Sequence, residues 1–180
     1  MIRMMNLVLM LTICGISYAQ ITRSVYGISL GDTETKVLQI MSSKNLIIET
    51  QISQHGKIIG GMGDVIFAGE SWDAISVTFR NDKVYGIMFV KENEGEEGRQ
   101  LLSIYSTLGK ALINKYPSYA LPPISREYSY GMDMSFVFSD KNTSLAFNLQ
   151  IRPDTKSTLT LGYVDNPELD IQSSENANEL

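Results

Sequence analysis

The sequence predicts an α+β domain in which an antiparallel β-sheet packs, by one face, on two α-helices. Residues 74–90 read as a β-hairpin, because apolar residues alternate with small or polar ones on both sides of the turn residues Asn81-Asp82-Lys83. Residues 33–44 and 101–116 carry apolar side chains at helical spacing. A lone hairpin is marginal in water, so we expect the two helices to cover its apolar face.

The register of this hairpin depends on its loop. A three-residue loop aligns apolar residues in three facing pairs, namely Phe79 with Tyr85, Val77 with Ile87 and Ile75 with Phe89. A two-residue loop at Asn81-Asp82 places Gly86 and Met88 on that face instead. The first register buries more apolar surface and is the one we expect, although the sequence leaves both open.

The N-terminus has the pattern of a secretory signal. Arg3 precedes an apolar segment at residues 7–16, and Ser17-Tyr18-Ala19 fits cleavage after Ala19. Cys14 would anchor a lipoprotein, but it follows Ile13 where a small residue is usual, so a cleaved signal at 1–19 is favoured over lipidation. We therefore expect a periplasmic or secreted protein, with no transmembrane segment in the mature chain.

The net charge and the cysteine content limit the classes of partner and of stabilising bond that the sequence predicts. The chain of 180 residues has a formal net charge of −5, and removal of Arg3 makes it more acidic. Without a basic tract, the sequence predicts binding neither to nucleic acid nor to anionic lipid. Cys14 is the only cysteine, so the mature domain would be stabilised by packing rather than by a disulfide.

The first half of the mature chain alternates strands with one helix. Asp32 or Thr33 is the expected N-cap of the helix, and Asn45 suits its left-handed C-terminal residue. Gly60, Gly61 and Gly63 favour a flexible loop over a phosphate-binding one. The expected elements are a strand at 21–28, a helix at 33–44, a strand at 46–52, a loop at 53–64, a strand at 65–68 and a connection at 69–73.

The second half repeats the order of helix and then strands. An acidic run at 91–97 precedes the second helix, where the helix dipole favours acids, and Pro117 ends that helix. The expected elements are a helix at 101–116, a loop at 119–130 and strands at 132–138, 144–151 and 157–163. We expect one domain at 20–164, with halves 20–91 and 92–164 of a duplicated unit, and a disordered acidic tail at 165–180.

The stretch Gly27-Ile28-Ser29-Leu30-Gly31-Asp32-Thr33, followed by apolar residues at 37–41, resembles small exported α+β domains of the SmpA/OmlA (BamE-like) and β-lactamase-inhibitor-protein-like group. The resemblance covers residues 26–90 best. It implies a sheet that is covered by helices on one face and used for protein contacts in the cell envelope. It does not identify any binding residue in this chain. The lipid-bearing cysteine of the first group and the paired cysteines of the inhibitors are not matched here.

Catalytic motifs are sparse. Gly27 to Gly31 matches the G-x-S-x-G turn that exposes a nucleophilic serine, here Ser29, but the only base is His55, and the chain is too short and too antiparallel for the fold behind that motif. A lone histidine with no cysteine anchors no ordinary zinc or iron site. We expect a non-enzymatic protein without a cofactor or a bound metal.

Two stretches are candidate binding surfaces. Aromatic and aliphatic residues gather after the second helix, and tyrosine is enriched in protein interfaces, so we expect binding of another envelope protein through Tyr119, Leu121, Tyr128 and Tyr130. The loop closing the sheet end is an equally weighted alternative. A different class of function, a small-ligand or glycan binder, would use Glu70, Trp72 and Asp73 as two carboxylates flanking a stacking ring.

Overall fold

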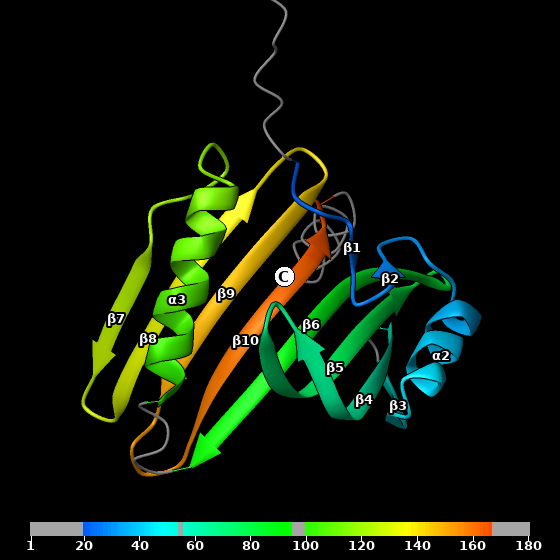
Figure 1. Cartoon of the computed structure of the whole chain (residues 1–180), viewed down its shortest axis with the longest axis horizontal. Helices are drawn as coiled ribbons and strands as arrows, with labels where there is room; N and C mark the ends of the chain where they lie inside the picture. Colours follow the sequence, from blue (N-terminus) through cyan, green and yellow to red (C-terminus); the bar gives the residue numbers. More distant parts are fainter. Residues whose placement is uncertain (1–19, 54–55, 95–99, 167–180) are drawn as a thin grey trace, which may run out of the picture.

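A computed structural model describes residues 20–53, 56–94 and 100–166. It contains an eight-stranded antiparallel sheet, a small two-stranded sheet and two helices (Figure 1). No helix of the described residues is long and apolar enough to cross a membrane. The elements are β1 (Ser24–Val25), β2 (Ile28–Ser29), α2 (Glu34–Ser43), β3 (Ile47–Ser53), β4 (Gly56–Phe67), β5 (Glu70–Arg80), β6 (Lys83–Glu94), α3 (Gln100–Lys115), β7 (Ile124–Tyr128), β8 (Gly131–Ser139), β9 (Thr143–Ile151) and β10 (Lys156–Asp165).

The large sheet joins two similar halves along one strand pair. Its strand order is β3-β4-β5-β6-β10-β9-β8-β7, so each half is a helix followed by four strands in which sequence neighbours pair. The last strands of the two halves, β6 and β10, pair with each other in the middle, with Phe89 facing Leu161. The expected order of helix and then strands therefore occurs twice, in one continuous sheet.

The β5–β6 hairpin combines features of both expected registers. Its turn has two residues, because Arg80 faces Lys83, and both Asn81 and Asp82 have positive φ, as a type I′ turn requires. A bulge then skips Tyr85, so that Thr78 faces Gly86. The expected pairs of Val77 with Ile87 and Ile75 with Phe89 are confirmed, whereas Phe79 faces Val84 rather than Tyr85.

The expected loop at 53–64 is wrong, since most of it is strand β4. Gly61 lies in the core, where an added Cβ would be 2.9 Å from Leu46 Cδ1 and 3.3 Å from Met41 Sδ. Gly63 has φ +140° and lies at an irregularity in the β4–β5 ladder. These glycines serve close packing and a bend, two roles that composition does not distinguish from a loop.

The chain before α2 also differs from expectation. Instead of one strand at 21–28, β1 and β2 form a small hairpin whose turn residues, Tyr26 and Gly27, both have positive φ. The helix itself is confirmed. Thr33 is its N-cap, and Asn45 beyond its C-terminus has φ 56°.

In the second half, α3 and strands β8, β9 and β10 match the expected elements closely. The expected loop at 119–130 contains edge strand β7, which pairs with β8. The tail begins later than expected, because Asp165 is the last residue of β10 and pairs with Arg23 at 2.6 Å. Asn166 also bonds to the carbonyl oxygen of Asn142, whereas tail residues 167–180 and the expected signal lie outside the described residues.

The core is continuous across both halves. In the first half, the Phe67 ring stacks on that of Phe89, with ring centroids 4.3 Å apart, and Trp72 packs against Phe89. In the second, α3 packs on β9 and β10, and its Tyr105 stacks on Phe136 and Phe147. Helix α2 contacts β2 and β3 and buries Val37 and Met41. Burial of these apolar surfaces stabilises the fold.

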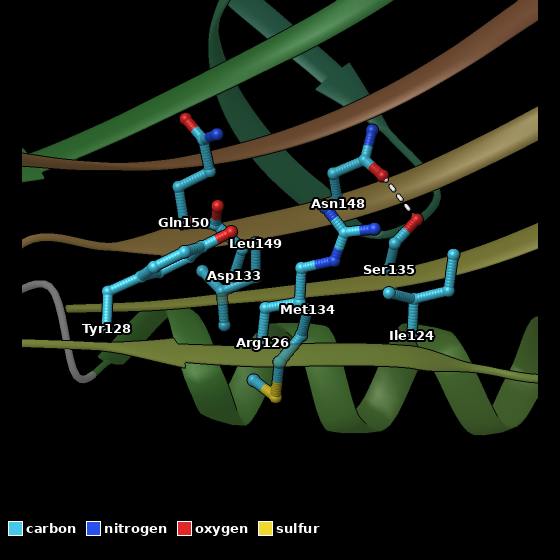
Figure 2. Close-up of a pocket in the computed structure, with 9 residues that line it drawn as sticks. All are labelled: Ile124, Arg126, Tyr128, Asp133, Met134, Ser135, Asn148, Leu149 and Gln150. Atoms are coloured by element: carbon cyan, nitrogen blue, oxygen red, sulfur yellow. Dashed lines mark hydrogen bonds between the residues drawn. The ribbon is translucent and has the colours of Figure 1, made fainter.

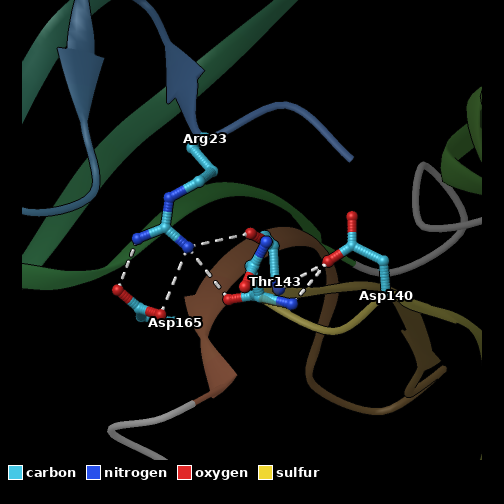
Figure 3. A network of polar contacts seen from close by, with 5 residues as sticks. Arg23, Asp140, Thr143 and Asp165 are labelled. Carbon is cyan, nitrogen blue, oxygen red and sulfur yellow. Dashed lines mark hydrogen bonds and ion pairs between the residues drawn. The ribbon is translucent and has the colours of Figure 1, made fainter. Parts of the chain in front are cut away.

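A polar network ties the N-terminal segment to the far half of the sheet (Figure 3). The Arg23 guanidinium makes two bonds to the Asp165 carboxylate, at 2.6 and 3.2 Å, and donates to the carbonyl oxygen of Asn142. The Asp140 carboxylate accepts hydrogen bonds from the backbone N–H groups of Ile21 and Thr143. Residues far apart in sequence thus hold the two halves together besides the β6–β10 ladder.

Candidate functional site

Figure 2 shows a shallow pocket of about 250 Å³ on strands β7, β8 and β9. Because Phe136 and Phe147 face α3, the alternation of side chains along a strand places Ser135 and Asn148 on the opposite face. The pocket therefore opens on the face of these strands that α3 does not cover. Its lining residues are Ile124, Arg126, Tyr128, Asp133, Met134, Ser135, Asn148, Leu149 and Gln150.

A row of polar side chains forms the floor of this pocket. Ser135 faces Asn148 across the β8–β9 ladder and donates to its Oδ1 at 2.6 Å. Asn148 faces Thr160 in β10, and its Nδ2 donates to the Thr160 hydroxyl at 3.3 Å. These amide and hydroxyl groups are half-buried and fixed by one another, so they form an ordered hydrogen-bonding surface.

One end of the pocket carries an aromatic and cationic cluster, which we call the Tyr128–Tyr130 cluster and define as Tyr128, Tyr130 and Arg152. The two tyrosine rings stack with centroids 5.1 Å apart and an interplanar angle of 10°. The Arg152 guanidinium lies over the Tyr130 ring, 5.3 Å from its centroid, and pairs with Asp133 at 2.5 Å. Tyr130 remains 57% exposed, so the cluster is ordered by these contacts and still accessible from solvent.

The tight β7–β8 turn positions this cluster. Tyr128 faces Gly131 across the turn, which brings Tyr130 beside Tyr128. Gly131 has φ +150°, and a Cβ there would collide with the carbonyl oxygen of Ile151. Only glycine fits this position.

The structure separates the four residues expected to form a protein-binding loop. Ala120 bridges to Phe138, so Tyr119 and Leu121 flank the C-terminal end of β8, whereas Tyr128 faces Gly131 at its start. Tyr119 is half-buried and packs against the core, and its carbonyl accepts from Ser139 N–H. Leu121 is 51% exposed. Only Tyr128 and Tyr130 lie together.

The residues of the alternative ligand site lie in β5 rather than in a connection. Trp72 is 1% exposed, and its Nε1 donates to the Phe67 carbonyl at 3.0 Å. A stacking ring for a sugar needs an exposed face, so the Trp72 indole serves packing instead. Asp73 accepts a hydrogen bond from the Glu92 N–H at 2.7 Å.

The G-x-S-x-G stretch comprises Gly27 of the β1–β2 turn, strand β2 and the first two residues of the connection to α2. Ser29 N–H donates to the Asp32 carboxylate at 2.8 Å, and Gly31 has φ +90°. His55 lies outside the described residues. Within the described ranges, no group of three or more His, Cys, Asp or Glu side chains is placed to hold a metal ion.

Sequence reasoning missed Arg152, Ser135 and Asn148. The alternation of β8 and β9 places polar residues on one face, which is the signal that would have found Ser135 and Asn148. No comparable pattern marks Arg152, because it follows β9 and contacts Tyr130 in the β7–β8 turn and Asp133 in β8, which are distant in sequence. Comparison with protein-family models, curated proteins and solved structures gives no match for this chain.

Proposed function

We propose that this chain is an exported, non-enzymatic module of the cell envelope that binds another protein through the Tyr128–Tyr130 cluster and the adjoining edge strand β7. The observation that carries the proposal is the stacked, exposed tyrosine pair held by Arg152. Tyrosine and arginine are enriched among the residues that contribute most to binding at protein interfaces, and tyrosine buries a large, rigid contact area at a low cost in conformational entropy. The N-terminal pattern of residues 1–19 supports export.

We also infer that α2 and α3 cover the same face of the large sheet. Met41 of α2 lies against Gly61, which faces Ile75 in β5. Directly facing residues share a face of an antiparallel sheet, and the buried residues that face one another in turn are Ile75, Phe89, Leu161 and Phe147. Since Phe147 stacks on Tyr105 of α3, both helices would lie on this face, and no helix of the described ranges would cover the other one.

Edge strand β7 extends this surface beyond the cluster. It pairs on one side with β8, and four of its five residues are exposed. Ile124, 49% exposed, lines the same pocket as Tyr128. A partner that contacts β7 would gain apolar contact from Ile124 and hydrogen bonds from Arg126 and the polar floor of the pocket, which is the mixed chemistry typical of non-obligate interfaces.

Site-specific photo-crosslinking in living cells tests this proposal. A photoreactive phenylalanine analogue at Tyr130 or Ile124 is expected to form an adduct with one recurring protein. The same analogue at Leu102, an exposed position on α3, is the matched control and should not form that adduct. Equal adducts from all three positions, or none from Tyr130, would sink the proposal.

The purified partner then allows a quantitative comparison. Tyr130→Ala is expected to weaken binding about 30-fold, the loss typical of an interface hot spot. Leu102→Ala should leave the affinity unchanged, and circular dichroism should show both variants folded. An unchanged affinity of folded Tyr130→Ala would place the interface elsewhere.

A further inference from the structure

We propose that an apolar cavity between α3 and the β4–β5 turn binds the hydrocarbon chain of a free medium-chain monocarboxylic acid, with its carboxylate on Lys115. The cavity has a volume of about 210 Å³. It lies apart from the Tyr128–Tyr130 cluster and uses none of its residues. Its lining consists of Phe67, Ala68, Leu108, Ala111, Leu112, Lys115, Tyr116, Leu161 and Tyr163.

Three elements build the walls of this cavity. The β4–β5 hairpin curls over the sheet toward α3, as Figure 1 shows, and brings Phe67 and Ala68 to the cavity. Helix α3 contributes Leu108, Ala111 and Leu112, while β10 contributes Leu161 and Tyr163. The lining is therefore almost wholly apolar, and its residues Ala68, Ala111 and Lys115 are exposed, so an apolar guest can enter from solvent and displace water from this surface.

Contacts behind Phe67 hold the wall of the cavity on the β4–β5 side. The Phe67 ring stacks on Phe89 and meets Tyr163 edge-on, with centroids 6.4 Å apart. Its carbonyl oxygen accepts the Trp72 Nε1–H bond. A bound hydrocarbon chain would remove the apolar lining from water, and this burial favours binding.

Charge complementarity selects a carboxylate as the head group of this ligand. Lys115 is the only charged residue among those that line the cavity, and none of them is acidic. Its ammonium lies 5.1 Å from the centroid of the Tyr116 ring, another lining residue. Burial raises the pKa of Tyr163, so its hydroxyl stays neutral.

The size of the cavity limits the length of the ligand. Pockets for drug-sized ligands measure about 300–1,000 Å³, so this smaller space suits one short chain rather than a sterol or a two-chain lipid. Octanoate is the probe that follows from this limit. Octanol, with the same chain and no charge, and octylamine, with the opposite charge, are its matched comparators.

Titration calorimetry of the purified protein, as the cell produces it, tests the proposal. Octanoate is expected to bind saturably at one site, up to about fivefold more tightly than octanol, because fivefold is near the upper limit of what an exposed ion pair contributes. Octylamine should bind more weakly than octanol. Trp72 fluorescence gives a second readout, since its indole is bonded to the carbonyl of the lining residue Phe67.

Two variants test separately how the cavity binds the hydrocarbon chain and how Lys115 binds the carboxylate. Ala111→Leu, which suits a helix, should fill the cavity and weaken octanoate and octanol alike by about tenfold. Lys115→Gln should remove the preference for octanoate over octanol, whereas Lys110→Gln, on the same helix but outside the lining, should keep it. If Ala111→Leu does not fold, the surface variant Lys115→Gln decides.

Absence of octanoate binding would overturn the proposal, as would binding that folded Ala111→Leu and Lys115→Gln leave unchanged. Tyr130→Ala should bind octanoate like the parent protein. The outcome for this cavity is therefore independent of the outcome for the protein-binding surface.

Discussion

Individual glycines in the first half of this chain differ in how closely the surrounding atoms pack against them. Gly60 and Gly61 are neighbours in β4, yet they meet different surroundings. A Cβ at Gly61 would lie 2.9 Å from Leu46 Cδ1 and 3.3 Å from Ile75 Cγ2, whereas at Gly60 the nearest atom is the Glu49 carbonyl oxygen at 3.9 Å. The two positions therefore form an internal pair of test and control.

Gly61→Ala is expected to lower the free energy of unfolding by about 1–3 kcal/mol, because the added methyl overpacks the contact among α2, β3 and β5. Gly60→Ala should change it by less than about 0.5 kcal/mol, as an ordinary surface substitution does. Urea denaturation of the two variants measures the difference. Equal effects at the two positions would contradict the packing role of Gly61.

At the scale of secondary-structure elements, two-residue turns with positive φ recur in the first half. Tyr26-Gly27, Ala68-Gly69 and Asn81-Asp82 each connect adjacent strands, and all six residues have positive φ. Turns of this kind match the right-handed twist of the strands they join. They keep the hairpins tight, and the bulge after Asn81-Asp82 restores the apolar register.

Asp82→Gly is expected to stabilise the protein by roughly 0.5 kcal/mol. The left-handed conformation costs an L-residue about 1–2 kcal/mol. Glycine avoids this cost, and the conformational entropy that it loses on folding costs only roughly 0.5–1 kcal/mol. Lys83→Gly is the control. Lys83 does not have a positive φ, and it faces Arg80 in the ladder. Lys83→Gly should therefore lower the free energy of unfolding by about 0.5–1 kcal/mol. Thermal or urea unfolding distinguishes the two signs.

The sequence predicted elements well where a strong local period determined them. Helices α2 and α3 and strands β8, β9 and β10 follow from apolar periodicity. The sequence predicts only the last residues of β4 as strand, because the role of Gly61 depends on packing against residues that are distant in sequence, such as Met41. At the site, composition pointed to Tyr128 and Tyr130, but Arg152 and Asn148 join them only through the pairing of three strands, which one sequence does not reveal.

At the scale of the whole molecule, the two halves share one core and one sheet. The β6–β10 ladder runs for nine residue pairs, and Arg23 in the first half pairs with Asp165 in the second. Trp72, the only tryptophan, lies in the first half. Its fluorescence therefore reports on one half, while a core substitution can be made in the other.

Phe147→Ala is expected to shift unfolding monitored by Trp72 fluorescence and by far-UV circular dichroism to the same lower midpoint. Phe147 is fully buried, and its truncation should cost about 3–5 kcal/mol. Ile113→Ala, at an exposed position of α3, should leave both midpoints near those of the parent protein. A Trp72 transition that Phe147→Ala does not move would show that the halves unfold separately.

The tie between Arg23 and Asp165 also determines how the molecule would be presented when it is tethered. Ile21 bonds to Asp140 just after β8, and Asn166 bonds to Asn142 in the same turn, so both ends of the described chain leave from one place. Tyr128 lies beside Gly131 at the start of β8, roughly 27 Å away for nine strand residues. A linker or membrane anchor attached directly at either end of the described chain would therefore leave the tyrosine pair at the far end of β8 from the point of attachment.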